Sequence, residues 1–99
     1  MLVLALLDQG ESYGYELVVR LQRAGLTDLA AGSVYPVLTR LERDGEITSR
    51  LVPSSAGPAR KYYLPTPAGA ASLARSAAAW RDLAGTVEPL LRTTEKESR

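Results

Sequence analysis

The sequence contains no cysteine and no histidine among its 99 residues. Without cysteine there is no disulfide and no thiolate metal ligand, and without histidine there is no Ser-His-Asp or Cys-His catalytic group. The carboxylates are scattered along the chain, and no glycine-rich loop of the kind that binds phosphates is present. We therefore expect no metal site and no cofactor, and we predict that the protein is not an enzyme.

Long apolar runs and a large net charge are also missing. No stretch approaches the ~18 apolar residues that a membrane span needs, and the apolar start Leu2–Leu7 has no basic segment before it. This start predicts a core helix rather than a signal peptide, so we expect a cytoplasmic protein that contacts no membrane. The formal net charge is only +1, so binding to a nucleic acid would require a local basic patch.

The order of the expected elements is the most informative feature that is present. Apolar spacing predicts a helix over 2–7, a helix capped by Ser12 that ends before Gly25, and a short helix over 33–44. Two β-like runs, 46–52 and 60–65, flank a turn-rich segment and form a hairpin. A long alanine-rich helix then starts at Pro67, with Thr66 as its cap, and we expect Pro89 to kink or end it.

This order predicts a mainly α fold with a small β-hairpin. It is the order of a winged helix-turn-helix, in which the hairpin is the wing, followed by a C-terminal dimerisation helix. We divide the chain into a DNA-binding domain over 1–66, the dimerisation helix over 67–92 and a polar tail over 93–99.

The short helix 33–44 has one apolar side and one polar side. Its apolar residues recur at the i, i+3, i+4, i+7 spacing of an amphipathic helix: Val34, Val37, Leu38 and Leu41. We place Pro36 in the first turn, where a missing N–H costs little, and Gly45 at the end. The second helix of a helix-turn-helix enters the major groove of DNA, and this helix takes that position. An ordinary surface helix with solvated arginines is the alternative.

Nine residues are candidate DNA contacts. Arg40 can donate two hydrogen bonds to a guanine edge, or it can pair with Asp44 one turn further on. Arg60 and Lys61 at the base of the hairpin suit phosphate contacts, and Tyr62 and Tyr63 fall on opposite faces of their strand, so one of the two belongs to the core. The full candidate set is Ser33, Tyr35, Pro36, Thr39, Arg40, Arg43, Arg60, Lys61 and Tyr63.

The last helix carries an apolar stripe with spacings of 4, 3, 4, 3 and 4 residues. Such an a/d seam is completed by a partner helix, which predicts a homodimer. Trp80, the only tryptophan, lies in this seam among small residues. It either anchors the interface or, together with its mate, flanks a planar aromatic effector. The stripe consists of Leu73, Ala77, Trp80, Ala84, Val87 and Leu91.

Three motifs, in order, resemble the PadR-like transcriptional regulators. They are Gly14-Tyr15-Glu16-Leu17, the run GxxYPxLxRLExxG from Gly32 to Gly45, and Arg60-Lys61-Tyr62-Tyr63. The resemblance extends from about Leu2 into the 80s. It implies a homodimeric bacterial repressor that binds a palindromic operator in double-stranded DNA and is released by a small molecule.

The resemblance also bears on two single residues. It assigns Tyr35 a contact to a DNA phosphate, whereas packing against the preceding helix is the alternative for this side chain. The chain departs from the family at Ala30, where members often have Ser or Thr, so we expect the helix over 33–44 to lack that N-terminal cap.

One different class of function stays open at this stage. A winged-helix domain can bind a protein partner and no DNA. An acidic short helix would favour that interpretation, whereas Arg40 and Arg43 favour DNA.

Overall fold

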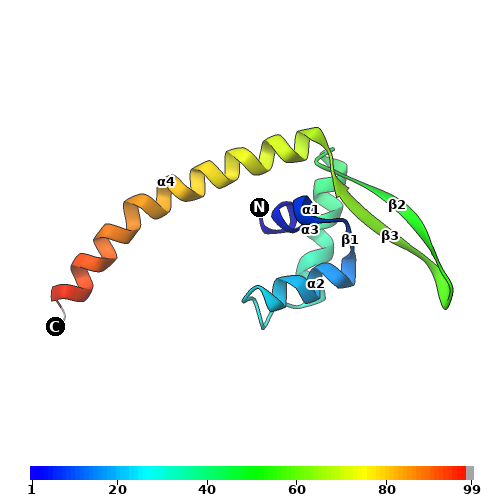
Figure 1. Cartoon of the computed structure of the whole chain (residues 1–99), viewed down its shortest axis with the longest axis horizontal. Helices are drawn as coiled ribbons and strands as arrows, with labels where there is room; N and C mark the ends of the chain where they lie inside the picture. Colours follow the sequence, from blue (N-terminus) through cyan, green and yellow to red (C-terminus); the bar gives the residue numbers. More distant parts are fainter. Residues whose placement is uncertain (98–99) are drawn as a thin grey trace.

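The computed structural model describes residues 1–97, which form four helices and a three-stranded antiparallel sheet. The elements are α1 (Leu2–Gln9), β1 (Ser12–Tyr13), α2 (Gly14–Arg23), α3 (Ala31–Arg43), β2 (Ile47–Ser54), β3 (Gly57–Pro65) and α4 (Pro67–Glu97). In Figure 1 the three short helices form a body, the β2–β3 hairpin projects from one side and α4 extends away on the other. The predicted winged helix-turn-helix, mainly helical with a small hairpin, is confirmed.

The core lies where α1, α2 and α3 meet the base of the hairpin. Burial of each aliphatic side chain there is worth about 1.5–3 kcal/mol, which fixes the three helices against one another. The buried residues of this cluster are Val3, Leu4, Leu7, Leu17, Val18, Leu21, Val34, Leu38, Leu41, Ile47 and Tyr63.

Strand β1 was not expected, and it corrects the predicted role of Ser12. This residue does not cap α2: it pairs with Tyr63 of β3, and its side chain is fully buried. Tyr13 occupies the N-cap position of α2 without a side-chain cap. The free edge of β3 supplies the reason, because pairing with it satisfies backbone groups that would otherwise be buried without partners.

Arg20 in α2 turns toward the end of α1 and the start of β1. Its guanidinium donates hydrogen bonds to the Leu6 carbonyl at 2.7 Å, the Gly10 carbonyl at 3.2 Å and the Ser12 hydroxyl at 2.5 Å. The last carbonyls of α1 have no intrahelical donor. Arg20 supplies one, and so it links the end of α1 to β1.

The ends of α3 agree only partly with the prediction. Gly45 follows the helix with a positive φ of 74°, and Ala30 stands at the N-cap without a side-chain hydrogen bond, as expected. The helix begins at Ala31, however, so Pro36 lies in its interior rather than in its first turn. The carbonyl of Gly32, which loses its donor to the proline, belongs to an exposed turn where water can replace that donor.

The start of α4 is bound to the turn between α3 and β2. Thr66 donates through its backbone N–H to the Glu46 carbonyl at 3.0 Å and through its hydroxyl to the Gly45 carbonyl at 2.6 Å. The same hydroxyl accepts a hydrogen bond from the Gly69 N–H at 3.1 Å, which makes it the predicted cap of α4. The direction in which α4 leaves the body is therefore fixed where α3 ends.

Beyond its first turns α4 runs clear of the body. The radius of gyration is 17.1 Å, whereas about 13 Å is expected for a compact chain of this length. The helix does not end at Pro89: it is curved but continuous in Figure 1 and reaches Glu97, so the expected polar tail is helical as far as it is described. Residues 98 and 99 of that tail lie outside the described residues. Within residues 1–97 no helix combines the length and the apolar character that crossing a membrane would require.

Candidate DNA-binding surface

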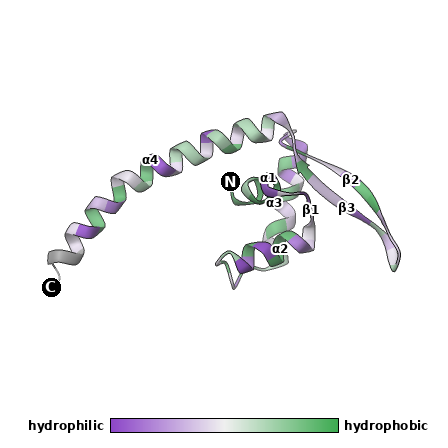
Figure 2. Cartoon of the chain, in the orientation of Figure 1, coloured by the Kyte–Doolittle hydropathy of each residue, from purple (hydrophilic) through white to green (hydrophobic). Residues whose placement is uncertain are grey.

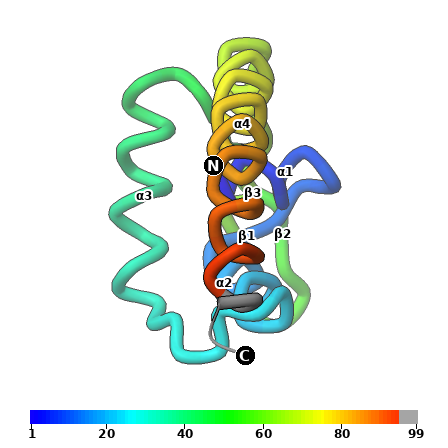
Figure 3. The backbone as a smooth tube through the Cα atoms, turned by 90° about the vertical axis from the view of Figure 1, so that its left-hand side faces the viewer, coloured from blue at the N-terminus to red at the C-terminus, as the bar shows by residue number. Residues whose placement is uncertain are grey.

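Helix α3 has a buried side and an exposed side, as its spacing predicted. Val34, Leu38 and Leu41 belong to the core. Figure 3 shows α3 at the edge of the molecule, where its other side is open to solvent. The exposed side brings together six of the candidate residues: Ser33, Tyr35, Pro36, Thr39, Arg40 and Arg43.

The polar groups on this exposed side differ in how they are engaged. Thr39 donates to the Tyr35 carbonyl of its own helix at 3.1 Å, and Arg43 pairs with Asp44 at 3.2 Å. Among residues 1–94, whose side chains are described, Arg40 makes no ion pair, so the alternative pairing with Asp44 is not formed. Its guanidinium keeps all its donors for an incoming acceptor.

Tyr35 packs against the start of α2. A Cβ added to Gly14 would lie 2.5 Å from Cε1 of the Tyr35 ring, so only glycine allows this approach. Tyr35 nevertheless stays 45% exposed, so part of this side chain is open to solvent. Sequence reasoning gave Gly14 no such role, although it begins the first of the three family motifs.

A shallow hollow connects this side of α3 with the wing. Arg60 stacks over the Tyr13 ring at 4.5 Å from its centroid, and Lys61 lies 5.3 Å from the centroid of Tyr63. Tyrosine hydroxyls and basic side chains are the groups that contact DNA phosphates and fix the register of a protein on the duplex. The residues that line the hollow are Tyr13, Gly14, Tyr15, Tyr35, Arg60, Lys61 and Tyr63.

The structure also settles which of the two adjacent tyrosines belongs to the core. Tyr63 is only 9% exposed and is a member of the core cluster, which corrects its place among the exposed DNA contacts. Its partners Ser12 and Ser49 on the two flanking strands place it in the middle of the sheet. Tyr62 is half-buried and meets Tyr13 edge-to-face at 5.4 Å.

Glu42 in the last turn of α3 contacts both strands of the wing. One carboxylate oxygen accepts from Lys61 of β3 at 2.8 Å, and the other accepts from the Ser49 hydroxyl of β2 at 2.7 Å. The hydrogen bonds from Lys61 and then from Ser49 lower the pKa of Glu42, and the bond to Glu42 raises the pKa of Lys61. Both groups are therefore charged at neutral pH. The sequence carried no signal for this contact, because the paired residues lie on different elements.

A second ion pair ties the segment before β1 to the wing. Arg50 of β2 donates through Nε to Glu11 at 3.0 Å, and this bond lowers the pKa of Glu11 and raises that of Arg50. The charge of Arg50 is thus engaged within the protein. Arg60 forms no ion pair with any side chain of residues 1–94, so it is a basic group that the wing still offers to a phosphate.

The apolar stripe of α4 is uncovered over its outer part. Leu73 packs against the core, and Ala77 and Ala84 are half-buried. Trp80, by contrast, is 56% exposed, and Val87 and Leu91 are exposed as well. Figure 2 shows apolar residues spaced along α4, whose outer part has no other element beside it.

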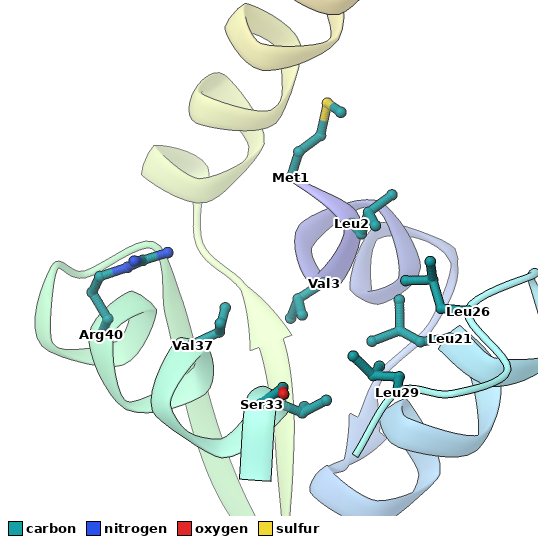
Figure 4. A pocket seen from close by; sticks show the side chains of 10 residues that line it. Met1, Leu2, Val3, Leu21, Leu26, Leu29, Ser33, Val37 and Arg40 are labelled. Carbon is teal, nitrogen blue, oxygen red and sulfur yellow. The ribbon is translucent and has the colours of Figure 1, made fainter. Parts of the chain in front are cut away.

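A further apolar hollow, of about 280 Å³, opens beside α3. Figure 4 shows leucines of α1 and α2 and of the segment that leads to α3 on one side of it, and Val37 and Arg40 on the other. This hollow lies on the body of the three short helices, whereas the outer part of the α4 stripe lies clear of that body. The lining residues are Met1, Leu2, Val3, Leu21, Leu26, Leu29, Ser33, Val34, Val37 and Arg40.

The fold and the exposed α3 define a winged-helix protein, and comparison with known proteins gives its family. The model of the transcriptional regulator PadR-like family matches residues 3–75. Transcriptional regulator Rv3488 of Mycobacterium tuberculosis is 40% identical over 79 residues, which cover 78% of this chain and 70% of that protein.

Solved structures agree with this result. A PadR-like transcriptional regulator of Bacillus cereus superposes with a TM-score of 0.82 at 39% identity, covering 90% of this chain and 86% of that one. Bacillus subtilis PadR in complex with operator DNA gives 0.65 at 27% identity, covering 75% of this chain and 42% of that one. The chain belongs to the PadR-like transcriptional regulator family. These proteins are regulators and not enzymes, which confirms the prediction on that point.

Proposed function

We propose that this regulator is a cytoplasmic, homodimeric repressor that binds a palindromic operator in double-stranded DNA. The observation that carries the proposal is the exposed side of α3, where Arg40 stands without an ion pair in the described part of the chain. The major groove is about 12 Å wide and admits a helix presented in this way. The operator complex of Bacillus subtilis PadR, a protein of similar fold, supports the same use of the domain here.

Each group on this surface has a role in the proposal. Arg40 reads a guanine edge through two hydrogen bonds, and Tyr35 contacts a phosphate from its place above Gly14. Arg60 contacts a phosphate from the wing, and three further groups on α3 make smaller backbone contacts. These three are Ser33, Thr39 and Arg43.

The operator is best tested by fluorescence anisotropy on DNA from upstream of the gene, over a series of salt concentrations. We expect the logarithm of the association constant K to fall linearly with the logarithm of the salt concentration. The slope should steepen by ~0.9 for each phosphate contact. Arg40→Ala is expected to weaken specific binding about 10-fold to 100-fold, because a bidentate guanine contact is worth ~1–3 kcal/mol. Arg75→Ala, which removes the same charge from the exposed surface of α4, should bind as the wild type does.

Two results would argue against this proposal. Equal operator affinities of the Arg40→Ala and wild-type proteins would contradict the proposed role of α3 in base recognition. A protein confirmed as a dimer that binds no DNA at moderate salt would favour the other winged-helix function, a module that binds a protein partner.

The dimer, in this proposal, forms through the stripe of α4, and a planar aromatic effector binds between the two copies of Trp80. The exposed part of the stripe gives an apolar surface that an a/d seam would cover. The small residues Ala77 and Ala84, one turn on either side of Trp80, leave room beside its ring. The effector then relieves repression by binding next to the dimer contact.

Trp80→Ala tests both parts of this arrangement. Fluorescence titration with a planar aromatic dye should show at least a tenfold weaker affinity, since a flat ring loses its stacking partner. Sedimentation of the wild-type protein should give the mass of two chains. A dye affinity that is unchanged by the substitution would leave Trp80 as a packing anchor only, and a monomeric wild type would contradict the dimer.

A further inference from the structure

The contact made by Glu42 differs from the others on α3 because it joins three elements. Glu42 lies in the last turn of α3, Ser49 lies on β2 and Lys61 lies on β3. The two oxygens of one carboxylate reach both strands, at 2.7 Å and 2.8 Å. Through these bonds α3 is connected directly to the wing.

Apart from the pairing of β1 with β3 and the ion pair of Arg50 with Glu11, the wing has few other contacts that would set its direction. Its outer part, from Pro53 to Lys61, is exposed apart from Ser54, and the core cluster reaches the hairpin only at Ile47 and Tyr63 near the base. An isolated two-stranded hairpin is marginally stable in water. The bonds to Glu42 therefore hold the hairpin where it leaves the body of the three short helices.

The same bonds change the expected role of Lys61. Its ammonium is held by Glu42 and lies beside the Tyr63 ring, whereas Arg60 has no acidic partner among the side chains of residues 1–94. Because the Glu42 carboxylate already neutralises the Lys61 ammonium, a phosphate would gain little from Lys61 unless that ion pair were lost. Arg60 can reach a phosphate without that loss.

We propose that Glu42 is a positioning residue that fixes the wing relative to α3 through Lys61 and Ser49. Lys61 then acts inside the protein, and it does not make the phosphate contact that the sequence suggested. This inference rests on the proposed DNA binding. It adds a residue that governs binding and does not touch DNA.

The proposal predicts an effect of unusual sign. Removing an acidic group from a DNA-facing surface ordinarily strengthens DNA binding, because phosphate repulsion falls. Glu42→Gln keeps the size of the side chain but loses the ion pair, and we expect it to weaken operator binding about fivefold. Ser49→Ala, which keeps the ion pair, should weaken binding in the same direction by a smaller factor.

A double-mutant cycle separates positioning from direct contact. Lys61→Met should weaken binding about as much as Glu42→Gln, and the double variant should be no weaker than either single variant. Arg60→Met, the matched control, should weaken binding by the same factor in both backgrounds and lower the salt slope by ~0.9. Tighter binding by Glu42→Gln, or an equal effect of Lys61→Met in both backgrounds, would overturn the proposal.

Hydrogen exchange on the free protein tests the link without DNA. We expect faster exchange of the β2 and β3 amides in Glu42→Gln, with exchange in α1 and α2 unchanged. If the wild type binds no DNA, the proposed function fails while this measurement still decides whether Glu42 holds the wing. Unchanged exchange in the wing would contradict the positioning role.

Discussion

Replacing Gly69 with alanine is expected to lower the free energy of unfolding by about 1–3 kcal/mol, the range of overpacked sites. A Cβ on Gly69 would lie 1.9 Å from the Glu46 carbonyl oxygen and 2.9 Å from its carbonyl carbon. These are backbone atoms at the turn between α3 and β2, so no side chain can move aside. The first turn of α4 would have to shift, and the bonds of Thr66 to this turn would shift with it.

Gly32→Ala is the matched control for this change. Gly32 also lies in a helix, but a Cβ there meets no atom within 4 Å. Alanine at a helical position is favoured over glycine by up to about 1 kcal/mol, so we expect no loss of stability. Urea denaturation should be run at one protein concentration, because a dimer unfolds in a concentration-dependent way. Equal midpoints for both variants would show that α4 does not depend on its contact with Glu46.

Arg20→Ala should destabilise the protein at least as much as Gly69→Ala does. We expect it to lower the free energy of unfolding by about 2–4 kcal/mol. Hydrogen bonds to charged groups contribute about 1.5–3 kcal/mol each, and the substitution removes three donated bonds at once. It also leaves the fully buried Ser12 hydroxyl without this partner.

Arg23→Ala removes the same charge from an exposed position three residues further along α2. We expect its free energy of unfolding to lie within about 0.5 kcal/mol of that of the wild type, as for other surface substitutions. Thermal unfolding followed by circular dichroism would compare the two variants. A similar small loss for Arg20→Ala would mean that water replaces the guanidinium without cost.

The sequence predicted those features that depend on neighbours along the chain. The two-sided character of α3, its end at Gly45 and the Thr66–Pro67 start of α4 all follow from local spacing and capping. The six exposed candidates on α3 were identifiable for the same reason. Each of these features is decided within about one or two helical turns.

The features that sequence reasoning missed depend on contacts between distant segments. Ser12 has the chemistry of a cap, but the free edge of β3 offers it a strand partner. Arg20 resembles a solvated residue until the end of α1 is placed beside it. The alternation of Tyr62 and Tyr63 is visible in the sequence, whereas the choice of the buried one depends on where β3 meets the helices.

Because α4 is attached to the turn after α3, a rotation of the long helix about its far end moves α3 with it. At 1.5 Å per residue its 31 residues span roughly 46 Å. If two copies join at the outer parts of α4, a 5° change in the angle at that joint displaces α3, roughly 46 Å away, by about 4 Å, little more than the ~3.4 Å rise of one base pair. In such a dimer the contact of Thr66 with Gly45 and Glu46 would pass this motion on to α3, so the angle between the two copies of α4 would set the half-site spacing to within about one base pair.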